Sequence, residues 1–295
     1  MLDFRINTFL CVCQTMNYTK AAAQLNITQP AVSSHIHYLE DYYGTSLFLY
    51  RNKKLYLTRQ GEILKERLQA MQNDEVQLKQ ELRPEDTGIK CLSFGVTMTV
   101  GEYAVVNPLA GFLKRHPDMN IHLKFGNTEQ LIHLLEDGKI HLALVEGYYP
   151  GDQYENLTYN TEDYIAVCAA EHVFRNGTPA CLRDLQGERL LIREKGSGTR
   201  EIMERSLSAR GIRLHDFSHF IEVENMHTIT ALLKEDCGIS FLYKIAVKEE
   251  LQNGRLREIK LRDFSMQHDL DFIWEKGSIY AGQYRRICEE LIKEK

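Results

Sequence analysis

The chain has 295 residues, which is too long for one ordinary domain and indicates two or three. Hydrophobic residues make up 43% of it and charged residues 26%, a balance that excludes an intrinsically disordered or low-complexity protein. The formal net charge is −5, yet residues 1–60 carry +3 and the remainder −8. A basic N-terminal segment followed by an acidic remainder is typical of a protein that binds nucleic acid through the N-terminal segment alone.

Membrane proteins and metalloproteins are not expected. No run of 18 apolar residues exists, so we expect no transmembrane helix and no membrane partner. Residues 1–9 carry alternate polar side chains rather than a signal-peptide core, so we expect a cytoplasmic protein. The seven cysteines form no C-x-x-C pair, which predicts reduced thiols, no metal site and no cofactor.

Residues 1–58 read as three helices followed by a short hairpin. Apolar residues recur over the first helix, 4–15, and Thr19 is placed to cap a second helix that ends at Leu25. Asn26 is a plausible left-handed stop, and Thr28 can cap a third helix that Gly44 ends. Two short helices joined by a three-residue turn predict a helix-turn-helix.

The third helix presents a polar face opposite its apolar residues, and Pro30 stands in its first turn. Serine, glutamine and histidine can donate to and accept from base edges, and the following hairpin has a basic tip. The alternative is a solvated polar face, but the turn, the proline and the basic wing together favour DNA. The candidate DNA contacts are Thr28, Gln29, Pro30, Ser33, Ser34, His37, Arg51, Lys53 and Lys54.

A long helix is predicted from Thr58 to about 83. It has an apolar seam in steps of three and four residues, which favours pairing with a second helix. The alternative is one more helix packed against its own domain. The seam comprises Leu64, Leu68, Met71, Leu78 and Leu82, and residues 84–88 read as a linker.

From Cys91 onward the chain alternates between predicted strands and helices, including a helix over 101–115 and a late strand over 269–274. In its first series, from Leu92 to Glu146, this alternation predicts a parallel sheet covered on both faces. Two turns carry hydroxyls at the start of a helix, one at Thr97–Thr99 and one at Ser197–Thr199. Such turns can hold an anion, although helix capping or a flexible loop explains each one alone. Turns of this kind in both halves point to a cleft between two lobes.

The run from Asn17 to Ser33 (NYTKAAAQLNITQPAVS), with Leu39-Glu40, Gly44, Leu47-Phe48, Arg51, Leu57-Thr58 and Gly61 after it, resembles the LysR-type transcriptional regulators. The match is dense over residues 1–64, and the remainder follows the family's plan. One departure is that Ser34, His35 and His37 stand where members often carry cations or amides. This departure leaves more of the phosphate anchoring to the wing.

The resemblance implies an α+β multidomain fold. Residues 1–58 would form a winged helix-turn-helix DNA-binding domain, and 59–88 a dimerising linker helix and hinge. Residues 89–295 would form a two-lobed α/β effector domain like the periplasmic binding proteins, with lobe I at about 89–162 and 267–295 and lobe II at about 163–266. The effector contacts it implies, together with those from the turns, are Thr97, Met98, Thr99, Asn127, Thr128, Gly147, Ser197, Gly198 and Thr199.

The function expected is a sequence-specific regulator that binds a double-stranded DNA operator and is gated by a small anionic metabolite. A homodimer or homotetramer is implied, and no enzymatic activity. One alternative is a redox-sensing member of the family, for which Cys168 and Cys181 are the nearest cysteine pair within the effector domain. A cytosolic two-lobed binding protein or enzyme is disfavoured, because no nucleophile elbow or cofactor fingerprint is present.

Overall fold

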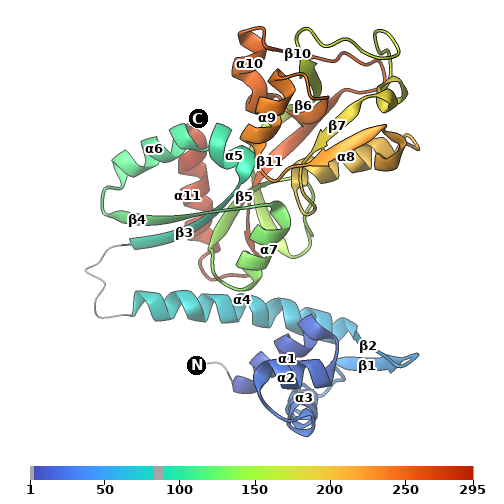
Figure 1. The fold of residues 1–295 in the computed structure, drawn as a ribbon. Coiled ribbons are helices and arrows are strands. Elements are labelled where there is room, and N and C mark those ends of the chain that lie inside the picture. The colour runs from blue at the N-terminus through green and yellow to red at the C-terminus, as the bar shows by residue number, and fades with distance from the viewer. Residues whose placement is uncertain (1–2, 83–89, 295) are drawn as a thin grey trace. The chain divides into compact units, whose positions relative to one another are not determined.

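The computed structural model describes residues 3–82 and 90–294, which divide into two compact units. The first unit holds residues 3–82 and the segment Glu275–Ala281, and the second holds residues 90–274 and 282–294. Figure 1 follows the chain through both. The linker predicted at residues 84–88 lies outside the described residues.

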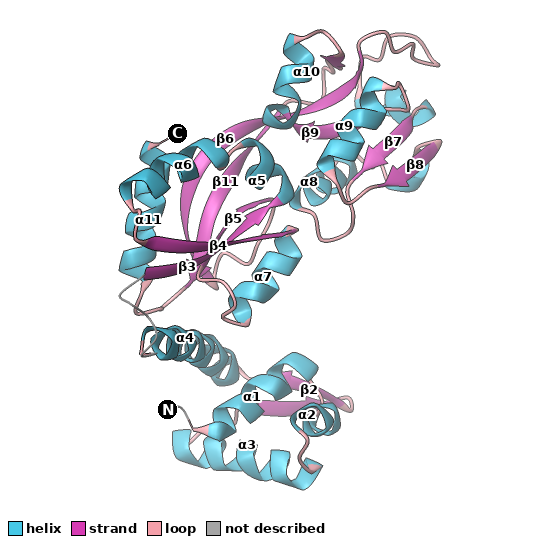
Figure 2. Ribbon diagram, turned by 60° about the vertical axis from the view of Figure 1, so that its left-hand side comes forward, coloured by secondary structure: helices cyan, strands magenta, loops and turns pink. Residues whose placement is uncertain are grey.

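The first unit is a three-helix domain with a hairpin, followed by one long helix (Figure 2). Its elements are α1 Phe4–Thr15, α2 Tyr18–Leu25, α3 Gln29–Tyr43, β1 Phe48–Arg51, β2 Lys54–Leu57 and α4 Arg59–Glu81. Asn17, rather than the predicted Thr19, caps α2, because its side chain accepts the amides of Thr19 and Lys20. The predicted left-handed stop is confirmed, since Asn26 has φ 55°.

The core of this unit is apolar and includes the first turns of α4. Phe9, Val12 and Ile36 are almost fully buried there, and Leu68 joins the same cluster with Leu64 packed against it. The residues of the predicted apolar seam therefore fall into a buried group and an exposed group. The seam's first two leucines pack within their own domain, while Met71, Leu78 and Leu82 are exposed. The reason is that α4 follows the hairpin directly and continues the domain core.

The second unit contains a seven-stranded mixed sheet and a separate two-stranded pair. The strands are β3 Lys90–Thr97, β4 Met119–Gly126, β5 Leu142–Glu146, β6 Tyr154–Ala169, β7 Arg189–Ile192, β8 His219–Glu222, β9 Ser240–Tyr243, β10 Leu256–Glu258 and β11 Met266–Glu275. The helices are α5 Met98–Tyr103, α6 Val106–Arg115, α7 Thr128–Glu136, α8 Gly198–Ser208, α9 Met226–Lys234, α10 Lys248–Gln252 and α11 Ala281–Lys293.

The predicted parallel sheet is confirmed for β3, β4 and β5, and these three strands belong to a larger mixed sheet. Its order is β10-β6-β11-β5-β3-β4, with β9 also paired to β6. Strands β4, β3 and β5 run parallel to one another, whereas β11 is antiparallel to β5, and β9 and β10 are antiparallel to β6. Late strands return to the first lobe from the second, so they enter the sheet without a crossover helix.

The unit has two lobes, and the sixteen-residue β6 is the longest strand in it. In the first lobe α7 covers one face of the sheet, where its Leu131 and Leu135 pack on Ala143 and Val145 of β5, and α6 and α11 lie on the other side (Figure 2). The helix predicted over 101–115 is two helices, α5 and α6, with a break at Ala104–Val105. Both α7 and α8 begin where a strand of their lobe has just ended, so their N-termini can meet.

Candidate DNA interface and effector cleft

The recognition helix α3 begins as predicted. Thr28 Oγ1 accepts a hydrogen bond from the Ala31 amide at 3.3 Å, and Pro30 lies in the first turn. The predicted contacts on this helix are exposed, apart from Ser33, which is half-buried. His37 Nδ1 lies 3.5 Å from the Glu40 carboxylate, so its protonated form has an acidic neighbour.

The wing is a tight hairpin with a basic tip. Asn52 and Lys53 both have positive φ, 51° and 60°, which is the backbone of a type I′ turn. Arg51 pairs with Lys54 across the hairpin, and these cations are exposed. A hollow of about 390 Å³ lies between the wing and the starts of α2 and α3, and its lining includes Asn17, Tyr18, Thr19, Gln29, Tyr50, Lys53 and Lys54.

One buried contact fixes the wing to α3. Glu40 Oε1 accepts the amide of Leu47 at 2.8 Å and that of Phe48 at 3.3 Å. The first strand of the hairpin therefore starts at a set distance from the recognition helix. A basic wing held beside a polar helix can bind phosphates while the helix contacts base edges.

In the effector domain, hydroxyls from both lobes converge on one carboxylate. Thr97 Oγ1 donates to Glu146 Oε2 at 3.1 Å, and Thr99 Oγ1 donates to Oε1 at 3.1 Å. Thr199 Oγ1, from the second lobe, donates to the same Oε1 at 2.6 Å. Glu146 is only 1% exposed, and the two hydroxyls of Thr99 and Thr199 are 3.5 Å apart.

Glu146 directly precedes the predicted contact Gly147, and the structure makes it the group that the predicted threonines bind. Burial raises the pKa of Glu146, while hydrogen bonds from Thr199, the charge of Arg193 and hydrogen bonds from the other two threonines lower it. The net direction is upward because the carboxyl group is cut off from water. No sequence motif marks this residue; the only signal is an acidic side chain at the end of an otherwise apolar strand.

Glycines let the lobes meet at this point. A Cβ on Gly198 would lie 2.1 Å from the Glu146 carbonyl oxygen, and one on Gly147 would lie 2.5 Å from the Gly198 Cα. Gly147 also has φ +88°, a conformation that side chains disfavour. These two predicted residues therefore touch one another, backbone against backbone.

The remaining predicted contacts lie around the same junction. Thr128 Oγ1 donates to the Glu146 carbonyl oxygen at 2.8 Å. Asn127 caps α7 and its Nδ2 donates across the cleft to Glu194 Oε1 at 3.3 Å. Met98 is half-buried, and nothing in the structure gives it a polar role.

Two donors at this junction lack partners among the described residues. Ser197 Oγ is buried without a hydrogen bond, although it stands at the N-cap of α8. Arg193 Nη1 is likewise buried and unbonded, while Nε and Nη2 of the same guanidinium bind Glu194. Buried donors of this kind are rare in folded proteins.

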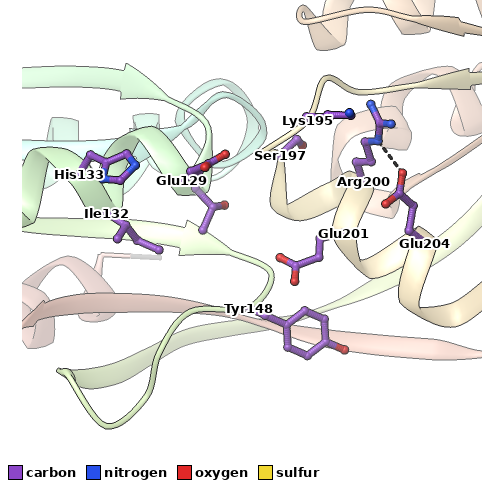
Figure 3. A pocket seen from close by; sticks show the side chains of 11 residues that line it. Glu129, Ile132, His133, Tyr148, Lys195, Ser197, Arg200, Glu201 and Glu204 are labelled. Atoms are coloured by element: carbon purple, nitrogen blue, oxygen red, sulfur yellow. Dashed lines mark hydrogen bonds and ion pairs between the residues drawn. The ribbon is translucent and has the colours of Figure 1, made fainter. Parts of the chain in front are cut away.

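A pocket of about 460 Å³ opens between α7 and α8 and includes Ser197 in its wall. In Figure 3, Glu129 and Glu201 approach this space from opposite sides, with Tyr148 below it. Arg200 is held by Glu204 at 2.7 Å, the dashed contact in Figure 3. The lining residues are Thr128, Glu129, Ile132, His133, Tyr148, Lys195, Gly196, Ser197, Arg200, Glu201 and Glu204.

The cysteines and possible metal ligands form no comparable site. All seven cysteines are free thiols, and burial raises the pKa of Cys168 to about 11, which leaves little reactive thiolate. Over residues 3–82 and 90–294, no group of three or more His, Cys, Asp or Glu side chains could hold a metal ion. Among the same residues, no helix combines the length and apolarity needed to cross a bilayer.

A winged helix-turn-helix in one unit and a two-lobed α/β domain in the other define a DNA-binding transcriptional regulator with an effector domain. Two family models match the chain: the LysR substrate binding domain over residues 90–293, and the bacterial regulatory helix-turn-helix protein, lysR family, over residues 5–62. The chain belongs to the LysR family.

Relatives that are named as transcriptional regulators align with most of the chain. The chain is 29% identical over 269 residues to the HTH-type transcriptional regulator CysL of Bacillus subtilis, covering 91% of this chain and 89% of that protein. It is 28% identical over 280 residues to the HTH-type transcriptional regulator CbbR of Rhodospirillum rubrum, covering 94% and 91%.

Solved structures share the fold. A Corynebacterium glutamicum OxyR mutant matches with a TM-score of 0.59 at 20% identity, covering 98% of this chain and 90% of that one. The Synechocystis CcmR regulatory domain in complex with 2-PG matches with a TM-score of 0.61 at 18% identity, covering 69% of this chain and 96% of that one.

Proposed function

We propose that a small anion, bound in the cleft between the two lobes, gates operator binding by this regulator. The observation that carries the proposal is the convergence of three threonine hydroxyls from both lobes on one buried carboxyl group, that of Glu146. A site whose donors already hold a carboxylate has the chemistry to hold an effector's carboxylate or oxyanion. Ser197 Oγ and Arg193 Nη1 supply two further buried donors.

The N-terminus of α8 supports the same ligand class. Helix amides without intrahelical partners and the helix dipole both favour negative charge at this end. Of the residues expected to contact the effector, Thr97, Thr99, Thr128, Ser197 and Thr199 carry hydroxyls and are buried at the junction. A ligand that binds one arrangement of the lobes more tightly shifts the population toward it.

For the DNA side, the proposal assigns base-edge contacts to α3 and phosphate contacts to the wing. The polar face of α3 is exposed, and Arg51, Lys53 and Lys54 are exposed beside it. The exposed residues Met71 and Leu78 on α4, with the exposed Leu82 directly after it, support a homodimer or homotetramer paired through this helix. The protein would act in the cytoplasm and without catalysis.

The effector site is tested by calorimetry and thermal shift with sulfate, inorganic phosphate and acetate as probes. Thr99→Val and Thr199→Val keep the side-chain shape and remove a donor, so each should weaken anion binding about tenfold while leaving basal DNA binding intact. Thr228→Val, on the exposed start of α9, is the matched control and should change nothing. If an anion binds and neither cleft variant alters its affinity, the site lies elsewhere.

A further inference from the structure

We infer that the cleft takes up one proton together with its anion, and that Glu146 and the anion share that proton. The inference rests on the proposed function, since it concerns an anion bound at the same threonines. It defines the ligand class more narrowly, as an oxyanion or carboxylate whose oxygen can accept a hydrogen bond from a carboxylic acid.

The first argument is geometric. Both oxygens of Glu146 accept threonine hydroxyls, and the residue is 1% exposed. An anion bound by Thr99 and Thr199 would place its own oxygens within hydrogen-bond reach of this carboxylate. Two like charges at that separation cannot both persist in a site closed to water, so one of them takes a proton.

The second argument is the charge available nearby. Of the groups that face Glu146, those on β3, α5 and α8 are the threonine hydroxyls, and its register partner on β11 is the apolar Leu270. Tyr164 on β6 and Tyr243 on β9 sense its charge, but burial raises the pKa of both phenols far above neutrality. Arg193 is the cation that acts on Glu146, and its guanidinium also forms an ion pair with Glu194.

One shared cation therefore faces one carboxylate before the ligand arrives and two negative groups afterwards. A proton from solvent restores the balance without breaking or forming any other bond. Glu146 then changes from acceptor to donor: its O–H donates to the anion, and the threonine hydroxyls donate to the anion as well. Because burial raises the pKa of Glu146, protonating it requires less free energy than protonating an exposed glutamate.

The test is calorimetry of the full chain with sulfate and acetate, neither of which titrates between about pH 6 and 8. Repeating each titration in buffers of different ionisation enthalpy counts the protons taken up. Over the pH range in which the free protein holds Glu146 ionised, the uptake should approach one proton per anion. The affinity should fall about tenfold per pH unit there, as linkage of one proton requires.

Glu146→Gln keeps the size and the acceptor oxygen and cannot titrate. Its proton uptake should be zero and its anion affinity constant over the same pH range. Glu249→Gln, an exposed carboxylate on α10, is the control and should retain the wild-type uptake. Anion binding by the wild type without proton uptake would overturn this inference and leave the proposed function standing. Persistent uptake in Glu146→Gln would overturn it as well, whereas failure of every probe to bind would remove the proposed function itself.

Discussion

Burial of Glu146 makes the stability of the effector domain depend on pH. Because its folded-state pKa is raised, the folded chain binds more protons than the unfolded chain above the ordinary glutamate pKa of about 4.3. Its contribution is therefore fully present below that pH and is lost as pH rises through the raised pKa. We predict that Glu146→Gln flattens this loss and is the more stable protein, by about 1–3 kcal/mol, at neutral pH.

Thermal unfolding of both proteins over a pH series checks this prediction. The difference in melting temperature should grow as pH rises and vanish toward pH 4. A difference that is constant over the whole range would mean that the amide changes packing rather than removing a buried charge.

At the same scale, the threonines of the cleft could be predicted from the sequence and their partner could not. Hydroxyls at the start of a helix after a strand end are visible as Thr97-Met98-Thr99 and Ser197-Gly198-Thr199. Glu146 is 47 residues from Thr99 and 53 from Thr199, and only the sheet order brings the three together. A lone acidic residue after an apolar strand carries no local sign of such a contact.

Substitutions in α3 and substitutions in the wing should have different effects on DNA binding. We predict that Ser33→Ala with His37→Ala lowers the discrimination between operator and random DNA, by about 1–3 kcal/mol for each base that the helix no longer reads. Lys53→Ala with Lys54→Ala should weaken all DNA alike and reduce the salt slope by about one unit for each phosphate that the wing no longer binds. Binding assays over a salt series, with operator and random duplexes, separate the two effects. If the serine and histidine changes leave the ratio untouched, α3 does not read the bases.

The packing of the long helix α4 decides which of its residues can be substituted to test the proposed assembly. Leu68 is 3% exposed inside the core of the first unit, so a charge there would unfold the domain. Met71 and Leu78 are 50% and 43% exposed, and Asp at both should dissociate the assembly without unfolding the monomer. Sedimentation measures the change, and Met71→Leu with Leu78→Ile, which keeps the apolar stripe, should leave assembly intact. An unchanged sedimentation coefficient for the Asp variant would place the interface on another surface.

Local signals predicted most elements and missed their connections. Thr28, Pro30 and Gly44 mark the ends of α3 because capping and positive φ depend on single residues. Periodicity alone extended one helix over α5 and α6, although Pro108 in the first turn of α6 is incompatible with a helical hydrogen bond to Ala104 and accounts for the break at Ala104–Val105. The late strand β11 was predicted without a direction, because its antiparallel pairing with β5 joins residues that lie far apart in the chain. Two of the five predicted seam residues, Leu64 and Leu68, belong to the core of the first unit, because apolar periodicity does not say which partner the residues meet.

Over the whole effector domain, the closed arrangement of the lobes depends on the absence of a side chain at Gly198. Its backbone conformation is ordinary for the first turn of α8, so alanine can adopt it without strain. The added Cβ would nevertheless lie 2.1 Å from the Glu146 carbonyl oxygen and 2.8 Å from Thr128 Oγ1, closer than atoms can approach. Each lobe can keep its own core, and the junction must open instead.

We therefore predict that Gly198→Ala folds, binds DNA and loses at least tenfold in sulfate or acetate affinity, because the donors of the two lobes no longer converge. Hydrogen exchange should rise at the end of β5 and the start of α8 and stay unchanged in the lobe cores. Gly151→Ala, a glycine with open space around its Cβ position, controls for the loss of backbone freedom and should bind as the wild type does. Unaltered anion affinity in Gly198→Ala would show that the ligand does not require the close approach of β5 and α8, and that the effector acts on an open form of the cleft.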